Sequence, residues 1–423
     1  MGNILKKLPK KPSQKPRKET AKKAWTFMVY MAGDNDLDSY GLTDVKEMKK
    51  VGSTGRVNIV VQFDRRSGHA AKRYYIRKGG KVDADVVQDL GATNTGDPKR
   101  LLDFIRWSVT DYPADRYALI LWNHGRGWDD TDMFADKRYR DLPRAATGPI
   151  RHALFHPPMQ RLMQEAAADP VARAILIDDN AKDFLDNLEL KKLLGETRKL
   201  LGRNLDLLGM DACLMSMAEI GYQICGSVDF TVGSQETEPG EGWPYTEILR
   251  ELTKNPEMKP RALSCLIVDR YLESYKGSGE AVTQSACDLA QAGPLADAVT
   301  GLAGALRTAL SDPPTQQCIL AARAKTQRYT IKHNIDLVDF CALLAKAAPG
   351  TPVAERCQEV IQVTQPGYVI AQGYEGDSMR NSHGAAIYFP TEEVSPLYAG
   401  LDFSKKTGWN GFLDAYLEAV KSR

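Results

Sequence analysis

Two apolar stretches of the chain each end at a residue that can do chemistry. Leu121–His124 brings the imidazole of His124, followed by Gly125, and Leu208–Cys213 ends at the thiol of Cys213. Ligands of open α/β sheets bind beyond the carboxyl ends of the strands. If these two strands are neighbours, the imidazole can activate the thiol as a nucleophile and then protonate a leaving group. Gly125 would let a backbone N–H group approach a developing oxyanion closely.

The position of Cys213 also predicts an effect on its thiol. Met217, Ile220, Gly221 and Ile224 have helical spacing, so we expect Cys213 in the first turn of a helix. Free N–H groups and the helix dipole at that place favour the thiolate over the thiol. The alternative is a small buried residue that closes a strand, as most cysteines are.

The elements that must position these residues are apolar runs separated by amphipathic segments. A helix should begin at Asp38 or Ser39 as N-cap, and another should have Pro98 at its first position. Strands are expected at residues 25–31, 57–63, 74–77 (antiparallel), 117–122, 174–177, 205–209 and 229–233. Alternation of strands and helices predicts an α/β fold with a mostly parallel sheet covered on both faces.

The chain divides into regions of different composition. Residues 1–23 are rich in Lys and Pro and should form a disordered basic tail, residues 24–257 the catalytic core, and residues 258–423 a mainly helical region. Within the core, residues 126–172 form an irregular insert. The last region is expected to hold helices at 262–275, 292–310, 335–347 and 352–363, and strands at 368–372 and 385–389 that return to the core.

Composition limits the classes of function. The 423 residues are 43% hydrophobic and 26% charged with a net charge of +2, and outside the tail the chain is mildly acidic, so specific nucleic-acid binding is not expected. The seven cysteines are widely spaced without a CxxC pair, which favours a reducing compartment. With no apolar signal segment and no run of about 20 apolar residues, we expect a cytoplasmic protein.

The ordered set of motifs resembles one known family. Trp122–Gly125 and Gly209–Cys213 are similar to the His-Gly and Asp-Ala-Cys signatures of the clostripain family of cysteine peptidases. Further similar blocks occur in the same order at residues 28–37, 117–122, 233–245 and 382–390. The resemblance implies a caspase-like α/β/α sandwich, a Cys–His dyad and an endopeptidase that cleaves after Arg or Lys.

The resemblance also implies roles for single residues. Cys213 would be the nucleophile, His124 the general acid and base, and the N–H groups of Gly125 and Cys213 the oxyanion hole. Asp211 would select a basic side chain through charge-assisted hydrogen bonds, although an N-cap is the alternative for it. The loop over residues 234–245 would line the substrate cleft with Ser234 and Glu236, and Trp243 would form a wall of that cleft. The glutamates of the loop could bind a basic peptide, or they could simply be exposed to solvent.

The insert offers candidate cleavage sites. Members of the family are often self-processed between the catalytic His and Cys, and this segment contains Lys137, Arg138, Arg140, Arg144 and Arg151. The alternative is a surface loop that is never cut.

The sequence also indicates which cofactors and partners to expect. The chemistry requires no cofactor, and no zinc motif is present. Some relatives need calcium, for which Asp34–Asp36 and Asp178–Asp179 are weak candidates. The expected partner is a peptide with a basic P1 residue, and the tail could contact anionic surfaces or only keep the chain soluble. A catalytically inactive, peptide-binding member of the same fold is the alternative function; the oligomeric state is not predicted.

Overall fold

A nine-stranded sheet organises the part of the chain that the structure describes. The computed structural model describes residues 22–68, 70–128, 175–178, 181 and 183–421. Within them the large sheet has the order β12-β10-β9-β8-β5-β1-β2-β3-β4. Its strands are β1 (Lys23–Gly33), β2 (Val57–Arg65), β3 (Ala70–Tyr75), β4 (Val86–Gly91), β5 (Ala114–Trp122), β8 (Leu205–Asp211), β9 (Val228–Gly233), β10 (Val282–Asp288) and β12 (Val369–Glu375).

The middle of this sheet is parallel and its two sides are antiparallel. Strands β2, β1, β5, β8 and β9 run in the same direction, whereas β3 and β4 on one side and β10 and β12 on the other pair antiparallel. Parallel neighbours need a crossover connection, so the carboxyl ends of the five central strands meet at one edge. That edge is where β5 delivers His124 and β8 delivers Cys213.

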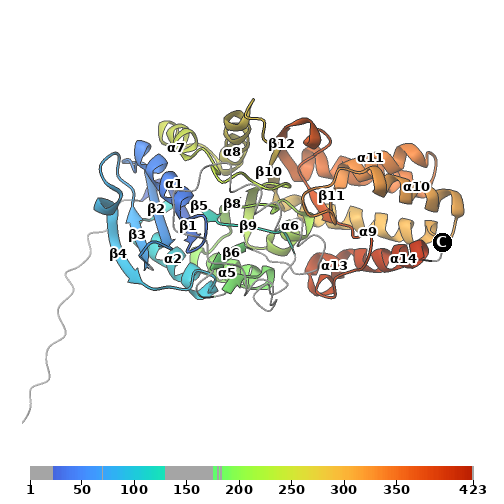
Figure 1. Ribbon diagram of the computed structural model, residues 1–423, viewed down its shortest axis with the longest axis horizontal. Helices are drawn as coiled ribbons and strands as arrows, with labels where there is room; N and C mark the ends of the chain where they lie inside the picture. Colours follow the sequence, from blue (N-terminus) through green and yellow to red (C-terminus); the bar gives the residue numbers. More distant parts are fainter. Residues whose placement is uncertain (1–21, 69, 129–174, 179–180, 182, 422–423) are drawn as a thin grey trace, which may run out of the picture.

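Helices cover both faces of the sheet (Figure 1). One face carries α1 (Asp38–Val51), α7 (Tyr245–Lys254) and α8 (Pro260–Tyr275), and the other carries α2 (Pro98–Asp111), α5 (Asn187–Leu201) and α6 (Ala218–Ile224). The central strand β1 shows how the two cores arise: Trp25, Phe27 and Val29 belong to one, and Met28 and Tyr30 to the other. Alternate side chains of a strand point to opposite faces, so both faces of an apolar strand are buried. The predicted α/β/α sandwich is confirmed.

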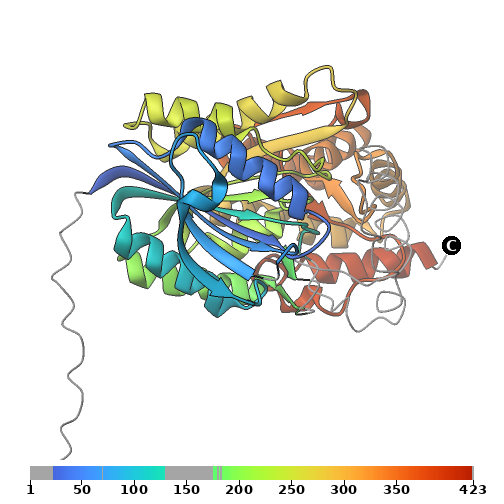
Figure 2. The same cartoon turned by 60° about the vertical axis from the view of Figure 1, so that its left-hand side comes forward.

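A helical region continues from the far side of this sandwich (Figures 1 and 2). It contains α9 (Ala292–Ala309), α10 (Pro313–Lys325), α11 (Leu337–Ala347), α12 (Pro352–Gln362), α13 (Asp402–Thr407) and α14 (Trp409–Lys421). Two small sheets pair β6 (Ile175–Asp178) with β7 (Asp183–Leu185) and β11 (Asn334–Asp336) with β13 (Ala386–Tyr388). Among the described helices, none is both long and apolar enough to cross a membrane.

Several predicted elements need correction. Helix α1 starts at Asp38 after Leu37, which supplies no side-chain cap, so neither Asp38 nor Ser39 is the N-cap. The strand expected at 174–177 lies in the small β6–β7 sheet, and the one expected at 385–389 pairs with β11 outside the large sheet. In α2, Pro98 does follow a capping residue, Asp97, whose side chain accepts from Lys99 N.

Other elements were not predicted, and one of them, β10, lacks a clear apolar period. Strand β10 reads Val-Thr-Gln-Ser-Ala-Cys-Asp, with three consecutive polar residues, yet it is buried between β9 and β12. Strands β4 and β11 and helices α7, α10, α13 and α14 were also not predicted. The basic tail overlaps β1 by one residue, since Lys23 begins that strand; residues 1–21 lie outside the described part.

Candidate active site

Strand register brings the two candidate catalytic residues together. In the parallel pair β5 and β8, Trp122 lies opposite Asp211. The ladder continues one step further, because Asn123 N donates to Asp211 O at 3.3 Å. His124 and Cys213 each follow two residues after that matched pair, and both line the same cavity. Adjacent strands are separated by about 4.8 Å, so the two segments that carry His124 and Cys213 leave neighbouring strands at the carboxyl edge.

The segment after Cys213 is a loop and not the start of a helix. Helix α6 begins only at Ala218, so the prediction that Cys213 lies in a first helical turn is wrong. Leu214 takes a left-handed conformation with φ of 67°, which a non-glycine residue rarely adopts. Two backbone bonds hold this loop in place: Leu214 N donates to Glu236 O at 3.1 Å, and Ser216 N to Ser234 O at 2.9 Å. A strained residue held by its surroundings beside a reactive group is typical of functional sites.

The loop geometry reverses the expected effect on the thiol. Cys213 is only 8% exposed, and burial raises its pKa to about 12, with the charges of Glu238 and Glu236 acting in the same direction. One contact opposes this rise, since Glu238 N donates to Cys213 Sγ at 3.3 Å. Without the helix terminus, Cys213 is a thiol at neutral pH in the substrate-free protein. It therefore needs a base to become a nucleophile.

His124 has an acidic partner that orients its ring. Its Nε2 lies 2.8 Å from Asp36 Oδ1. Burial alone would raise the pKa of Asp36, but the charge and the hydrogen bond of His124 outweigh it and lower the pKa. Because Asp36 engages Nε2, Nδ1 is the ring atom that remains to act on a neighbouring group. In the sequence Asp36 was considered only as a weak calcium ligand.

Gly125 is required by the close approach of the Cys213 loop. A Cβ atom at Gly125 would lie 2.5 Å from Cys213 O and 3.0 Å from Ala212 Cβ. Cys213 O is a backbone atom and Ala212 Cβ is bonded to the backbone, so neither can move aside unless the loop shifts. Gly125 therefore keeps the segment that carries His124 in direct contact with the loop that carries Cys213.

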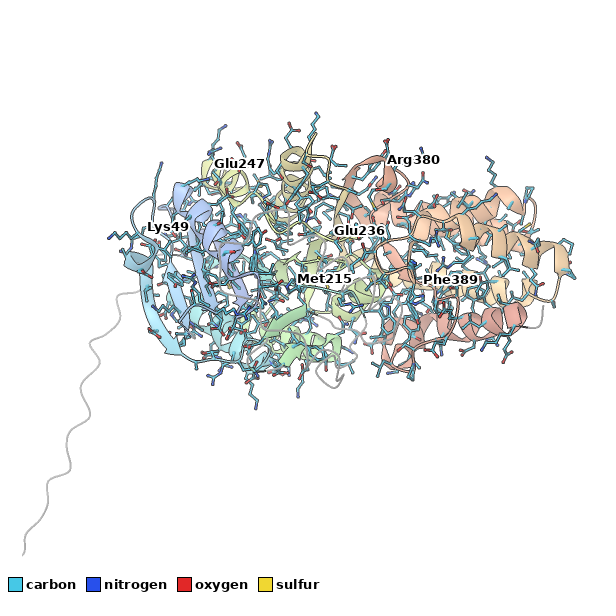
Figure 3. All side chains as sticks on the ribbon, in the orientation of Figure 1. Lys49, Met215, Glu236, Glu247, Arg380 and Phe389 are labelled. Atoms are coloured by element: carbon cyan, nitrogen blue, oxygen red, sulfur yellow. The ribbon has the colours of Figure 1, made fainter. Side chains whose placement is uncertain are left out.

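The two candidate catalytic residues open onto an acidic cavity of about 240 Å³. Five carboxylate residues line it, and none of the other described lining residues is Lys or Arg; the acidic ones are Asp36, Asp211, Glu236, Glu238 and Glu280. Glu236 and the loop residue Met215, labelled in Figure 3, lie in the middle of the molecule between the sheet and the C-terminal helices. Thr330 and Met379, which come from the C-terminal region, close one side of the cavity. A cavity of this charge favours a cationic ligand.

Asp211 and Glu238 form what we call the carboxyl pair. Burial raises the pKa of both groups, repulsion from Asp211 raises that of Glu238 further, and their side chains are hydrogen-bonded to each other. Burial and mutual repulsion disfavour two ionised carboxyl groups at this distance from each other, so the pair favours a state that holds one proton. Tyr245 Oη donates to Asp211 Oδ2 at 2.7 Å and Gln284 Nε2 to Glu238 Oε1 at 3.2 Å. Trp243 adds a backbone hydrogen bond to Asp211 and a side-chain one to Glu238.

The surroundings of Asp211 leave it open to the cavity. Gly242 has a φ of 59°, and a Cβ there would lie 3.0 Å from Asp211 Oδ1. On the other side Trp122 lines the cavity, and its Nε1 donates to Asp44 Oδ2 at 2.8 Å. Burial, followed by the charge of Asp211, raises the pKa of Asp44 well above its usual range. Asp211 thus lies at the end of β8 as a cavity residue and does not cap a helix.

Two of the predicted cleft residues do not line the cavity. Trp243 is fully buried and is not a wall: its ring packs over Gly209, where a Cβ would lie 2.8 Å from its Cη2. Ser234 is also fully buried, with its hydroxyl 2.9 Å from both Glu236 O and Thr283 Oγ1. Glu236 does line the cavity, where its carboxylate accepts from Thr330 N at 3.0 Å.

The acidic residues considered for calcium are engaged elsewhere. Asp36 binds His124, and Asp178 Oδ2 accepts from Thr95 N at 3.0 Å and from Thr95 Oγ1 at 3.1 Å. Among the residues that the structure describes, no three or more His, Cys, Asp or Glu side chains are grouped to hold a metal ion. Asp179 lies outside them. These residues give no reason to route any step through a metal.

Comparisons with known proteins identify the family of the chain. The model of the Clostripain family matches residues 29–140 and 163–416. Clostripain of Hathewaya histolytica is 28% identical over 252 residues, and the match spans 53% of this chain but only 41% of that relative.

Solved structures support the fold. A secreted C11 cysteine protease from Bacteroides thetaiotaomicron, in complex with an irreversible peptide inhibitor, has a TM-score of 0.62 at 19% identity and covers 92% of this chain and 99% of its own. An inactive zymogen C11 protease from Parabacteroides distasonis has a TM-score of 0.63 at 19% identity, with the same coverage. The caspase-like sandwich expected from the sequence is therefore confirmed. Because the family model matches most of the length of this chain, the chain belongs to the clostripain family of cysteine peptidases.

Proposed function

We propose that the protein is a cysteine endopeptidase that cleaves peptide bonds after Arg or Lys. The observation that carries this proposal is the β5–β8 register, which brings His124 and Cys213 to one acidic cavity that Asp211, at the end of β8, also lines. A thiol, a base and a buried carboxylate in one cavity meet the requirements of nucleophilic catalysis on a substrate with a cationic side chain.

Recognition of the basic side chain rests on the carboxyl pair. A guanidinium or ammonium group that enters the cavity would replace the shared proton as the partner of Asp211 and Glu238. Charge-assisted hydrogen bonds in a buried site are stronger than neutral ones. Arg and Lys at P1 are therefore the proposed specificity, and the geometry favours neither over the other.

In the proposed mechanism, His124 moves a proton between Cys213 and the leaving amine. His124 Nδ1 takes the proton of Cys213 as Sγ attacks the scissile carbonyl carbon, while Asp36 stabilises the imidazolium through Nε2. The N–H groups of Gly125 and Cys213 bind the oxyanion. The imidazolium then protonates the leaving amine, and a water activated by the same ring hydrolyses the thioester.

Hydrolysis of fluorogenic peptide amides tests the proposal. We expect turnover with Arg or Lys at P1, little with Asp or Leu, and none by Cys213→Ala. A chain that binds basic peptides without turnover would instead be the inactive, peptide-binding member of the fold. Turnover that survives Cys213→Ala would reject the dyad.

Self-processing and cellular location are further proposals. Cleavage in the insert is supported by its basic residues and by a relative described as a zymogen. The candidate sites Lys137, Arg138, Arg140 and Arg144 lie outside the described residues. Intact mass of the wild type against Cys213→Ala tests cleavage, and cell fractionation tests the proposed cytoplasmic location.

A further inference from the structure

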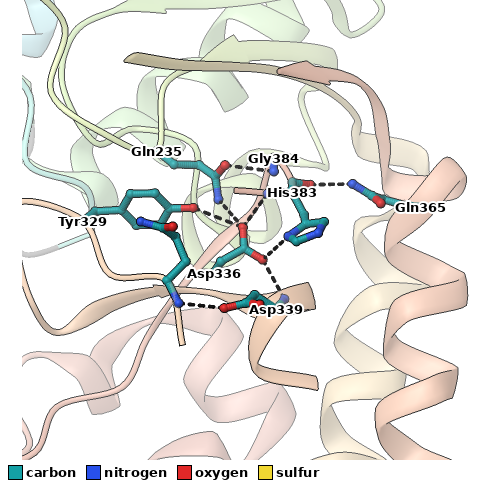
Figure 4. A network of polar contacts seen from close by, with 8 residues as sticks. Gln235, Tyr329, Asp336, Asp339, Gln365, His383 and Gly384 are labelled. Carbon is teal, nitrogen blue, oxygen red and sulfur yellow. Dashed lines mark hydrogen bonds and ion pairs between the residues drawn. The ribbon is translucent and has the colours of Figure 1, made fainter. Parts of the chain in front are cut away.

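A buried carboxylate outside the cavity collects an unusual number of donors. Asp336 is fully buried at the start of α11, and five groups donate to its two oxygens (Figure 4). They are Asp339 N at 2.8 Å, His383 Nδ1 at 3.1 Å, His383 N at 2.7 Å, Gln235 Nε2 at 3.0 Å and Tyr329 Oη at 3.1 Å. The bond to Asp336 raises the pKa of His383, which favours the ion pair. A buried carboxylate is retained only when its lone pairs are satisfied in this way.

One of these donors belongs to the cavity loop, which we define as residues 234–242. Gln235 is 2% exposed and uses its whole side chain in the network. Its Nε2 donates to Asp336, its Oε1 accepts from Gly384 N at 2.8 Å, and its backbone N donates to Thr283 Oγ1 at 3.0 Å. The amide therefore ties the cavity loop to two segments of the C-terminal region at once.

The bonds continue from Gln235 to the nucleophile. Its neighbour Glu236 accepts from Leu214 N, the residue after Cys213, and Glu238 N donates to Cys213 Sγ. A second connection runs from the segment after His383: Ser216 Oγ donates to Gly384 O at 2.8 Å, and Ala386 N to Ser216 O at 3.0 Å. The strained loop around Cys213 is thus held between two segments that both depend on Asp336.

We propose that Asp336 is a positioning residue for the reaction, acting through Gln235 to hold the cavity loop and the Cys213 loop in register. This inference rests on the proposed peptidase function. It makes the C-terminal region a part of the catalytic machinery and not only a support for the sheet. The floor of the cavity does not depend on this network, because Asp211 lies on β8 and is bonded to Tyr245.

Two isosteric substitutions test the link between the two residues. In Asp336→Asn, one carboxylate oxygen becomes an NH2 group that meets the donors Gln235 Nε2 and His383 N. In Gln235→Glu, the NH2 group that donated to Asp336 becomes an oxygen, so two carboxylates face each other. Displacements of about 1 Å at a reacting centre can cost about a hundredfold. We expect each change to lower kcat for an Arg amide about ten- to a hundredfold, with KM changed less than about threefold, because misplacement affects the transition state more than the bound cation.

The double variant separates positioning from general damage. In Asp336→Asn combined with Gln235→Glu, the amide at position 336 can donate to the carboxylate at position 235, and the bond to Gly384 N is kept. The new amide still faces His383 N, which donated to the same oxygen of Asp336. We therefore expect partial recovery, with kcat at least about threefold above that of either single variant, a coupling that a double-mutant cycle measures. If Asp336→Asn does not fold, Gln235→Glu and the double variant still provide the comparison.

Glu219→Gln is the matched control. Glu219 is a buried carboxylate that also joins the core to the C-terminal region, by accepting from Tyr388 N and Tyr398 Oη. Its described hydrogen bonds do not reach the cavity loop. We expect its thermal stability to change while kcat stays within about threefold of the wild type.

A second measurement distinguishes this inference from the proposed function. Alkylation of Cys213 by iodoacetamide needs no peptidase activity, and losing the N–H donor of Glu238 should leave less thiolate. We expect each single variant to react at least about threefold more slowly and the double variant to recover. A wild type without peptidase activity would reject the proposed function alone. Failure of the double variant to recover in both assays, or an equal kcat loss in Glu219→Gln, would reject the positioning role.

Discussion

Replacing Asp211 by Asn should abolish most of the specificity for basic residues without harming the fold. The variant keeps the size of the side chain, and its amide can still accept from Tyr245 Oη and donate to Glu238. It removes one charge-assisted bond to the substrate cation, while Glu238 remains. Such bonds contribute about 1.5–3 kcal/mol, and loss of one partner of a buried charge pair costs about 3–5 kcal/mol. At about 1.4 kcal/mol for each factor of ten, kcat/KM for an Arg amide should fall roughly a hundred- to a thousandfold.

The same variant should be at least as stable as the wild type at neutral pH. Burial raises the pKa of Asp211, so its protonated form is favoured in the folded protein. The stability that such a group contributes is complete below its ordinary pKa and is lost as the pH rises through the raised value. The wild type should therefore lose stability relative to Asp211→Asn as the pH rises from about 4 to about 6, by about 1.4 kcal/mol for each unit of pKa rise.

The assay pairs steady-state kinetics with thermal unfolding at pH 5 and pH 7.5. Asp206→Asn is the matched control, because Asp206 is a buried carboxylate at the opposite end of β8, where it accepts from Tyr117 N at 2.8 Å and pairs with Arg203. We expect that control to lose stability and keep its preference for Arg and Lys. An Asp211→Asn enzyme with unchanged kcat/KM for the Arg amide would refute the assignment of Asp211 to the cavity floor.

Three further outcomes are expected. Asp36→Asn should lower kcat about tenfold or more with little change in KM, since the amide no longer stabilises the imidazolium; a pure KM effect in steady-state kinetics would contradict this. Gly125→Ala should remove most activity in the same assay because its Cβ would lie 2.5 Å from Cys213 O, and a fully active variant would show that this close contact is not needed. KM for an Arg amide should fall as the pH rises through about 6, the raised pKa of Asp211, because the carboxyl pair then gains negative charge; a pH-independent KM would argue against the pair as the binding site.

The sequence predicted the sandwich and the meeting of His124 with Cys213 because both follow from strong local patterns. Apolar runs such as 117–122 are buried on both faces, and a parallel sheet gathers their carboxyl ends at one edge. Strand β10 carried no such signal, because its burial comes from neighbours distant in sequence and not from its own apolar residues.

The wrong prediction for Cys213 arose because the helical spacing of the apolar residues after it was extended back to Cys213 itself. The helical spacing after Cys213 is real, but the chain first makes a strained loop that pairs with the cavity loop, so the helix starts five residues later. That shift turns a favoured thiolate into a buried thiol. Trp243 was expected as a cleft wall because it lies in a Gly- and Pro-rich loop, yet Gly209 leaves a space under the sheet that its ring fills.

Other features could not be read from the sequence at all. The Asp36–His124 contact joins residues 88 positions apart, and the carboxyl pair depends on the fold of the cavity loop. Thr330 and Met379 reach the cavity from the helical region without any motif that announces them.

The central claim is that Cys213 is the nucleophile of a cavity that selects basic residues. The most direct measurement is to treat the protein with a peptidyl chloromethyl ketone that has Arg at P1 and to locate the adduct by peptide mass spectrometry. One adduct on Cys213, absent when the reagent has Asp at P1 and absent in His124→Ala, is the predicted result. Labelling spread over the other cysteines, or equal labelling by both reagents, would contradict it.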